Sequence, residues 1–304
     1  MNTARIAELL EPFLRTPAAS SETSGPSDNN HSEAPVSYLS PAPARSQPAC
    51  PQPAPKGRDV LSLAQLQHIS TYIDILLRWN ARVNLTAIRD PEEIVTRHFG
   101  ESLFAASHLF PVPASGSSAV KALDSTIDAD GERKEGSAPA NVLNENLFVS
   151  PPSNTLADIG SGAGFPGLPI KLWTPHISLT LIESNHKKAA FLREVTRALT
   201  LTDVNIQTAR AETLIRSTYD VVTLRAVDRF DSILPTAAAL VAPAGRLALL
   251  IGASQVDQAR STLPAFSWSD PVPIPHSRVR VLLFGNQSSN KWNDNPIKRH
   301  GTLA

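Results

Sequence analysis

An apolar segment that ends in an acid and then breaks into glycines is the feature that most constrains this chain. Residues 156–167 read LADIGSGAGFPG, and a helical pattern follows them. Glycine permits φ > 0 and has no Cβ to obstruct a ligand, while the first N–H groups of a helix find no partner inside the helix. We therefore expect a strand, a turn and a helix that hold a cofactor against unpaired backbone at Gly160 and Gly162.

Two classes of cofactor fit this turn. From Gly162 to Gly167 it satisfies the G-x-G-x-x-G pattern of dinucleotide sites, and Glu183 follows about 20 residues later, where an acid would bind ribose hydroxyls. Pro166, however, has no N–H to offer a pyrophosphate. With Asp158 the turn reads D-x-G-x-G-x-G, which resembles the first motif of class I S-adenosylmethionine (SAM) methyltransferases. That resemblance implies SAM as cofactor, with Asp158 hydrogen-bonded to its ammonium group directly or through water.

Proline is concentrated in two stretches without periodicity. Of the 26 prolines, 10 lie in residues 1–55 and 5 in residues 111–154. Segments of this composition cannot bury enough apolar surface to fold alone. The expected division of the chain is a short helix (1–15), a disordered Pro/Ala/Ser-rich linker (16–57), a helical part (58–110), a disordered insertion (111–154), the cofactor-binding core (155–285) and a flexible tail (286–304).

The formal net charge of zero conceals an asymmetry. Residues 1–55 and 111–154 together carry −5, so the remainder carries +5, which is compatible with a polyanionic partner. The only cysteine is Cys50, so we expect no disulfide and no metal site. No apolar run reaches the roughly 18 residues of a membrane span and no signal pattern is seen, which predicts a cytoplasmic protein without membrane contact.

Periodicity predicts helices first and then alternating strands and helices. Helical spacing occurs at 5–14, 62–80 and 91–109, the last with Asp90 as N-cap and Pro91 at its first position. Strands are expected at 155–159, 178–183, 203–208, 219–224 and 245–251, helices at 185–199, 212–216 and 230–241, and a terminal hairpin at 266–272 and 278–284. The alternation requires a mostly parallel sheet of seven strands, with helices on both faces and the ligand at the carboxyl ends of the strands.

Several segments together resemble one family, the RsmG (GidB) methyltransferases. They are WNARVNLTAI at 79–88, Arg97-His98, Glu101-Ser102-Leu103, the turn with its Phe165-Pro166-Gly167 ending, Lys187-Lys188, Phe191-Leu192 and Arg225-Ala226-Val227. Members of that family use SAM to methylate N7 of one guanine in the decoding-region loop of bacterial 16S ribosomal RNA. The resemblance spans about residues 60–110 and 155–284. It implies a Rossmann-like class I methyltransferase fold with an N-terminal helical extension.

The resemblance also implies which residues form the site. The SAM contacts of the family fall on Gly160, Phe165, Ala211, Glu212 and Arg225, to which the turn adds Asp158, Gly162 and Glu183. Guanine N7 carries an exposed lone pair, so no general base is expected and catalysis consists of orientation. The expected positioning groups are Arg225, Asn84, Arg97 and His98. The implied partner is 16S rRNA or the small ribosomal subunit, bound by a monomer.

Departures from the family pattern leave alternatives open. Leu224 replaces a usual Ser, Ile251 a usual Lys and Glu101 a usual Asp. Loss of the lysine would suit a methyltransferase of the same fold that acts on a small molecule or a protein. A non-catalytic nucleotide-binding or RNA-binding module is the third possibility. For Trp79, core packing is favoured over base stacking, and Lys187 and Lys188 fit either a solvated helix face or phosphate contact.

Overall fold

A sheet with one antiparallel end organises the protein. The computed structural model describes residues 1–15, 61–111, 154–214, 218–225 and 230–287. Its strands run in the order β3-β2-β1-β4-β5-β8-β6, and β7 also pairs with β8. They are β1 (Thr155–Ile159), β2 (Ser178–Ile182), β3 (Val204–Gln207), β4 (Tyr219–Arg225), β5 (Val241–Gly252), β6 (Phe266–Trp268), β7 (Val272–Pro273) and β8 (Arg280–Gln287). β1 to β5 are parallel, and β8 is antiparallel to its neighbours.

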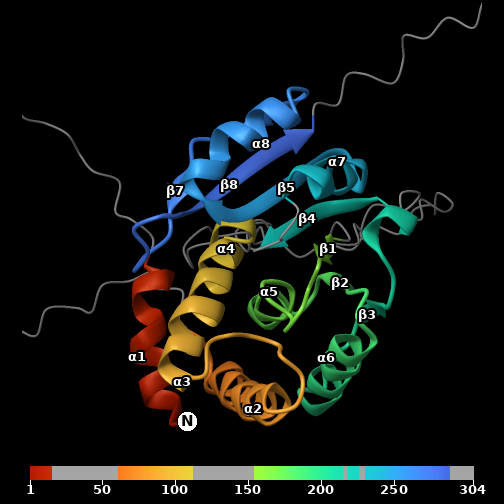
Figure 1. Ribbon diagram of the computed structural model, residues 1–304. Coiled ribbons are helices and arrows are strands. Elements are labelled where there is room, and N and C mark those ends of the chain that lie inside the picture. Colours follow the sequence, from red (N-terminus) through yellow and green to blue (C-terminus); the bar gives the residue numbers. More distant parts are fainter. Residues whose placement is uncertain (16–60, 112–153, 215–217, 226–229, 288–304) are drawn as a thin grey trace, which may run out of the picture.

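The helices form a layer on each face of this sheet. Figure 1 shows α7 and α8 on one side and the remaining α-helices on the other. They are α1 (Thr3–Leu14), α2 (Leu63–Asn80), α3 (Pro91–Glu93), α4 (Glu101–Leu109), α5 (Gly167–Trp173), α6 (His186–Ala198), α7 (Phe230–Ala239) and α8 (Val256–Thr262). Successive strand residues face opposite sides of the sheet. Leu156 therefore packs with the layer that contains α1 to α6, and Ala157 packs with α7 and α8. The strand order reverses at β1, which places the switch point between β1 and β4.

The segment before the sheet departs from the single helix expected at 91–109. It begins as predicted, because the Asp90 side chain accepts the N–H of Glu93 at 2.8 Å and Pro91 occupies the first turn. Its middle, η1 (Ile94–Gly100), is π-helical, and α4 continues directly from it. Wider helical turns of this kind are rare in proteins, and those that occur are frequently found at functional sites. Here they carry His98 and Phe99, whose rings both contact Phe165.

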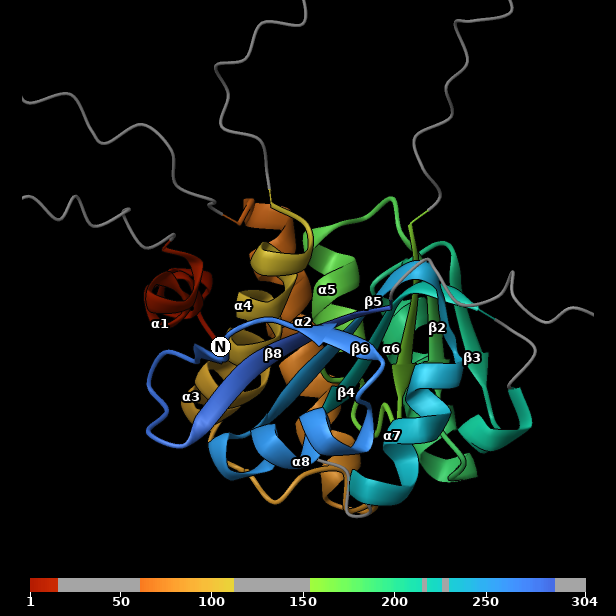
Figure 2. The ribbon, with the colours of Figure 1, turned by 90° about the horizontal axis from the view of Figure 1, so that it is seen from above.

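Helix α1 packs against this helical segment. Figure 2 shows it beside α4, and its apolar face contacts η1, α2 and α4. Its buried side chains are Ile6, Leu10 and Phe13. The Phe13 ring lies over Gly100, where an added Cβ would come within 2.6 Å of it. The N-terminal helix thus completes the layer that covers the face of the sheet opposite α7 and α8.

The α/β sheet predicted from the sequence is confirmed, with eight strands in the described part instead of seven. The poorer strand expected at 266–272 is two strands, because the hydrogen-bonding to β8 is interrupted before Pro271. β5 starts at Val241 instead of Gly245, with an irregularity in its pairing to β4, so α7 ends earlier than expected. Helix α8 was not anticipated.

Most of the segments expected to be disordered, at 16–57, 111–154 and 286–304, lie outside the described residues. The helical part expected from residue 58 is described from residue 61. Residues 215 and 216 of the short helix expected at 212–216 also fall outside, and the remainder is the 3-10 helix η2 (Ala211–Leu214). No helix in the described ranges combines the length and the apolar character needed to cross a membrane.

Substituting Gly100→Ala should weaken the attachment of α1. The backbone at Gly100 is helical, with φ −56° and ψ −54°, so alanine alone would favour it by about 1 kcal/mol. Contact with the Phe13 ring reverses that sign and should lower the free energy of unfolding by about 1–3 kcal/mol, measured by urea denaturation. In the Phe13→Ala background the same substitution should become neutral or stabilising. Equal destabilisation in both backgrounds would contradict this packing.

Candidate functional site

Two cavities meet at Gly160, where β1 ends. The first, of about 460 Å³, lies over the ends of β1 and β2 and the start of η2. The second, of about 290 Å³, lies between the glycine turn and the N-terminal helical layer, by which we mean α2, the loop after it, η1 and α4. Its walls include Thr86 and His98 from that layer and Gly162 and Phe165 from the turn. The two cavities together occupy the switch point of the sheet, where open α/β sheets bind ligands.

The turn after β1 uses the conformational freedom of glycine. Gly160, Gly162 and Gly164 have φ of 67°, 55° and 84°. A Cβ at Gly164 would overlap the hydroxyl group of Tyr72 and come within 2.6 Å of Leu168. The close approach of α2 to the turn therefore requires a residue without a side chain at this position.

The N–H groups of the turn are largely occupied by the protein itself, so the expected cradle of unpaired backbone is not what forms. The N–H groups of Gly160 and Ser161 donate to the carbonyl of Ile182 at 2.9 and 3.2 Å. That of Gly162 donates to the Glu183 carboxylate at 2.9 Å. The cause is β2, whose end runs beside the turn and supplies acceptors. Gly160 and Gly162 line the second cavity, and they contribute room rather than free donors.

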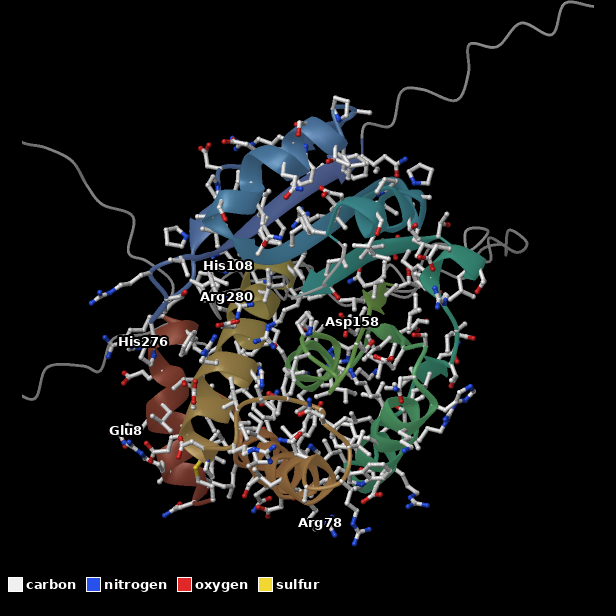
Figure 3. All side chains as sticks on the ribbon, in the orientation of Figure 1. Glu8, Arg78, His108, Asp158, His276 and Arg280 are labelled. Carbon is white, nitrogen blue, oxygen red and sulfur yellow. The ribbon has the colours of Figure 1, made fainter. Side chains whose placement is uncertain are left out.

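Asp158 is fully buried beneath the turn, and Figure 3 shows it in the interior. One carboxylate oxygen accepts the hydroxyl of Thr223 at 2.9 Å and the other accepts the N–H of Gly167 at 3.2 Å. Burial raises the pKa of Asp158 to about 6. The residue is not among those that line the two cavities. In the structure Asp158 thus anchors the turn to β4 and α5, and its hydrogen bond to the SAM ammonium, direct or through water, stays a prediction.

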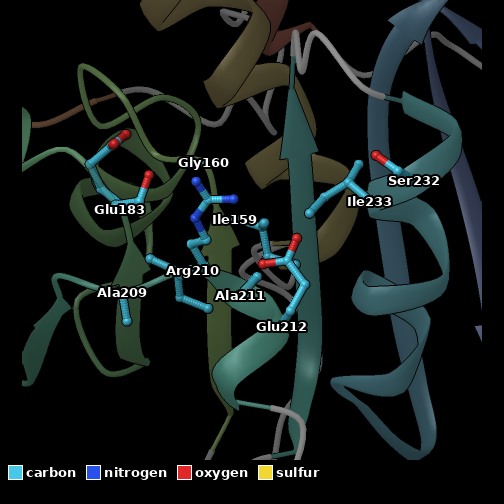
Figure 4. Close-up of a pocket in the computed structure, with 11 residues that line it drawn as sticks. Ile159, Gly160, Glu183, Ala209, Arg210, Ala211, Glu212, Ser232 and Ile233 are labelled. Atoms are coloured by element: carbon cyan, nitrogen blue, oxygen red, sulfur yellow. The ribbon is translucent and has the colours of Figure 1, made fainter.

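Four of the predicted cofactor residues line the first cavity together: Gly160, Glu183, Ala211 and Glu212 (Figure 4). Glu183 follows β2, and its second carboxylate oxygen accepts the N–H of Asn185 at 2.8 Å. Ala211 is buried at the start of η2, and Glu212 is exposed beside it. Arg210 also lines this cavity and lies between Glu183 and Glu212 in Figure 4. Sequence reasoning did not single out Arg210.

Phe165 joins the glycine turn to the helical layer. Its ring stacks between those of Tyr72 and His98, with centroid distances of 5.4 and 4.7 Å, and meets Phe99 edge-on at 5.1 Å. The hydroxyl of Tyr72 donates to the carbonyl of Ala163 at 2.5 Å. One side chain of the turn is therefore enclosed by rings from α2 and η1, and this contact fixes where the helices stand relative to the sheet.

Arg225 ends β4 and is buried against the helical layer, with 7% of its side chain exposed. One of its terminal nitrogens shares its two hydrogens among the Arg97 carbonyl at 2.7 Å, His98 Nδ1 at 3.0 Å and Glu101 at 3.1 Å. Glu101, equally buried, also pairs with Arg280 at 3.2 Å. Burial lowers the pKa of Arg225 to about 10. Its Nε is buried without a hydrogen-bond partner among the described residues.

His98 lies between this cluster and the loop that follows α2. Burial, and after it the charges of Arg225, Arg97 and Arg280, together lower the pKa of His98 to about 3. The imidazole is therefore neutral at physiological pH. Its Nε2 lies 2.8 Å from the hydroxyl of Thr86.

The loop from 81 to 90 is organised by Asn80 instead of the predicted Asn84. The buried Asn80 amide accepts the N–H groups of Leu85 and Thr86 at 2.9 and 3.0 Å and donates to the Thr86 carbonyl at 2.9 Å. Leu85 and Thr86 line the second cavity, whereas Asn84 is exposed. Asn84 is thus not among the residues that line the cavity, and its positioning role stays a prediction.

Cationic side chains surround the second cavity. Arg97, Lys188 and Arg280 line it together with Arg225. Arg280 is the register partner of Gly252 across β5 and β8, so it lies next to Ile251, where the family resemblance implied a lysine. Leu224, the other departure, is fully buried in the core that faces α7. In the described part of the chain, no group of three or more His, Cys, Asp or Glu side chains could hold a metal ion.

Sequence reasoning missed Tyr72, Asn80 and Arg280. Tyr72 and Asn80 occupy the buried face of α2, where the pattern shows only that a residue faces the core. Arg280 reaches the site because β8 pairs antiparallel with β5, a neighbour that the order of elements alone does not specify. Glu101 carried a signal that could have been used, since an acid within an apolar helix needs a cationic partner.

The buried carboxyl of Asp158 predicts a pH dependence of stability. Because folding raises its pKa from 3.8 to about 6, its contribution is fully present below pH 3.8 and is lost as the pH rises through 6. In Asp158→Asn, which stays neutral, this loss is absent. The difference in unfolding free energy, wild type minus variant, should fall by roughly 2 kcal/mol between pH 4 and pH 7 in urea titrations. A difference that stays constant or rises with pH would refute the assignment.

Comparison with known proteins places the chain in a family. The family described as GidB, rRNA small subunit methyltransferase G, matches residues 65–112 and 141–273. Proteins named ribosomal RNA small subunit methyltransferase G are similar: that of Roseiflexus sp. (strain RS-1) is 35% identical over 73% of this chain and 83% of its own. That of Chloroflexus aggregans is 34% identical over 73% and 82%, and that of Xylella fastidiosa 34% identical over 65% and 74%. The chain therefore belongs to the GidB family of small-subunit rRNA methyltransferases.

Proposed function

We propose that this protein transfers the methyl group of SAM to N7 of a guanine in the decoding-region loop of bacterial 16S rRNA. The observation that carries the proposal is the junction of two cavities at Gly160, one lined by carboxylates and apolar side chains and the other by cations. A cofactor that spans Gly160 would lie in the first cavity and direct its reactive end into the second. We further propose that the protein acts as a monomer in the cytoplasm.

The residues of the first cavity fit SAM. Ile159, Ile182 and Ile233 supply an apolar lining for an adenine ring, and Glu212 an acceptor for its amino group. Each oxygen of Glu183 accepts one backbone N–H and keeps a lone pair for a ribose hydroxyl. The guanidinium group of Arg225, a residue that lines the second cavity, would bind the carboxylate of the methionine part. Bound there, SAM supplies a methyl group on a sulfonium, which is a good leaving group.

The chain needs to orient the guanine, and it needs no general base to remove a proton. Guanine N7 has no proton to remove and offers its lone pair at the edge of the base. The walls formed by Phe165, His98 and Thr86 restrict how a base can enter the second cavity. Holding N7 about 3 Å from the methyl group, in line with the methyl–sulfur bond, can supply several kcal/mol. The neutral state of His98 fits this requirement, since a protonated imidazole would repel the cationic cofactor.

The cations around the second cavity fit an RNA backbone. Arg97, Lys188 and Arg280 line its walls, and Arg97 and Lys188 come from two different helices, η1 and α6. Glu101 neutralises only one of its two buried arginine partners, so positive charge remains at the opening. Phosphate contacts from such side chains fix the register of an RNA without reading its sequence.

A methyl-transfer assay tests the proposed function. Purified protein incubated with radiolabelled SAM and small subunits that lack the modification should place label in 16S rRNA, and mass spectrometry should find 7-methylguanosine at a single decoding-region position. Naked 16S rRNA in a parallel reaction shows which form is the substrate. Label in a protein or a small molecule instead would favour the alternative methyltransferase, and SAM binding without transfer to RNA would refute the enzyme assignment.

Arg280→Ala should weaken RNA binding selectively. Removing one phosphate contact should reduce the affinity for 16S rRNA several-fold and lower the slope of log affinity against log salt by about 0.7 to 0.9. SAM affinity, measured in parallel, should fall less than RNA affinity, because Arg280 shares Glu101 with Arg225 but does not line the first cavity. Arg197→Ala, an exposed cation at the far end of α6, is the matched control. An equal loss of RNA affinity in both variants would show that Arg280 has no special role.

A further inference from the structure

The hydroxyl of Thr86 occupies a defined place in the second cavity. Its oxygen accepts the backbone N–H of Ile88 at 3.1 Å and lies 2.8 Å from Nε2 of His98. The other ring nitrogen, Nδ1, lies 3.0 Å from a terminal nitrogen of Arg225. A guanidinium group can only donate, so a proton on Nδ1 would face another donor at this distance, and we assign Nδ1 as the acceptor. The proton of the neutral imidazole is therefore on Nε2, which donates to Thr86.

Both acceptor positions of the Thr86 hydroxyl are consequently in use. A hydroxyl has two lone pairs and one hydrogen, and here Ile88 and His98 take the lone pairs. What remains is the hydrogen, which can only be donated. Thr86 lines the cavity opposite the glycine turn, so the group that meets a ligand there is a donor that cannot rearrange into an acceptor.

The surroundings hold this donor in place. The buried Asn80 amide binds the N–H and the carbonyl of Thr86. The ring of His98 stacks on Phe165, and Arg225 fixes its orientation from the other side. The low pKa of His98 keeps the imidazole from taking a second proton near neutral pH. A polar group supported by rigid neighbours in this way discriminates between ligands more sharply than a mobile one.

We propose that Thr86 donates a hydrogen bond to O6 of the target guanine and thereby makes the site select guanine over adenine. This inference rests on the proposed function. In guanine, N7 and O6 lie on the same edge and both accept, whereas adenine presents an amino group beside N7. A donor fixed at Thr86 satisfies O6 when N7 faces the methyl group. It would instead oppose the amino hydrogens of adenine, which leaves two donors facing each other.

The test replaces the atoms at position 6 of the base. Small subunits are reconstituted with 16S rRNA that carries guanosine, inosine, 2-aminopurine riboside or 2,6-diaminopurine riboside at the target position. Guanosine and inosine have O6, 2-aminopurine has hydrogen there, and 2,6-diaminopurine has an amino group. Single-turnover rates of methyl transfer are measured for the wild type, Thr86→Val and Thr86→Ser. Comparing each variant with the wild type on the same base cancels the intrinsic reactivity of N7.

Thr86→Val, which keeps the shape without the hydroxyl, should slow transfer about 10-fold to 100-fold on guanosine and inosine. On 2-aminopurine its rate should stay within about twofold of the wild type, and on 2,6-diaminopurine it should rise. Thr86→Ser, which keeps the donor, should stay near the wild type on all four bases. An equal loss on every base, or no loss on guanosine, would overturn the proposal.

Two further measurements separate the possible failures. SAM affinity of Thr86→Val, measured by calorimetry, should match the wild type and shows that the variant is folded. If it does not fold, the ¹⁵N NMR spectrum of His98 in the wild type decides, because a proton on Nδ1 instead of Nε2 would remove the basis of the inference. If the wild type transfers no methyl group to any rRNA, the proposed function itself fails. If it methylates guanosine and Thr86→Val loses no base preference, only the role of Thr86 fails.

Discussion

The stacking of Phe165 between Tyr72 and His98 connects the two halves of the structure on which the site depends. The sheet and its glycine turn would form one cavity alone. The other cavity exists because α2 and η1 bring their rings to the side chain that the turn projects, and because Gly164 lets Tyr72 approach. Moving this aromatic contact would displace His98, and with it the hydrogen bond between His98 and Thr86 at the wall of the second cavity.

Buried charge supports the same arrangement. Arg225 and Arg280 share Glu101, so the end of β4, the start of β8 and α4 are held together by one carboxylate. Breaking such a cluster by removing one partner is costly, since it leaves an uncompensated charge in the interior. The cluster also sets the state of its neighbour: Arg225 orients the His98 ring and helps to keep it neutral. Structural and chemical roles therefore coincide in the same side chains.

Much of this could be predicted from the sequence, for identifiable reasons. The turn at Gly160 and the alternation of strands and helices follow from local patterns, and the switch point follows from their order. The hydrogen-bond networks were harder to predict from the sequence. Glu183 and Asp158 were expected at a ligand, yet both carboxylates accept N–H groups of the chain. Asn80 organises the loop and Asn84 does not, because the fold buries Asn80 and exposes Asn84. The sequence alone does not show which of two asparagines near a helix end will be buried.

The central claim is that two cavities joined at Gly160 form one site, with the cofactor in the first and its reactive end facing the second. A crystal structure with S-adenosylhomocysteine bound tests it most directly. The account predicts adenine beside Ala211 and Ile233, ribose at Glu183, and the sulfur atom at Gly160 directed toward the wall formed by His98 and Thr86. Adenine in the second cavity, or a sulfur atom directed away from that wall, would contradict it.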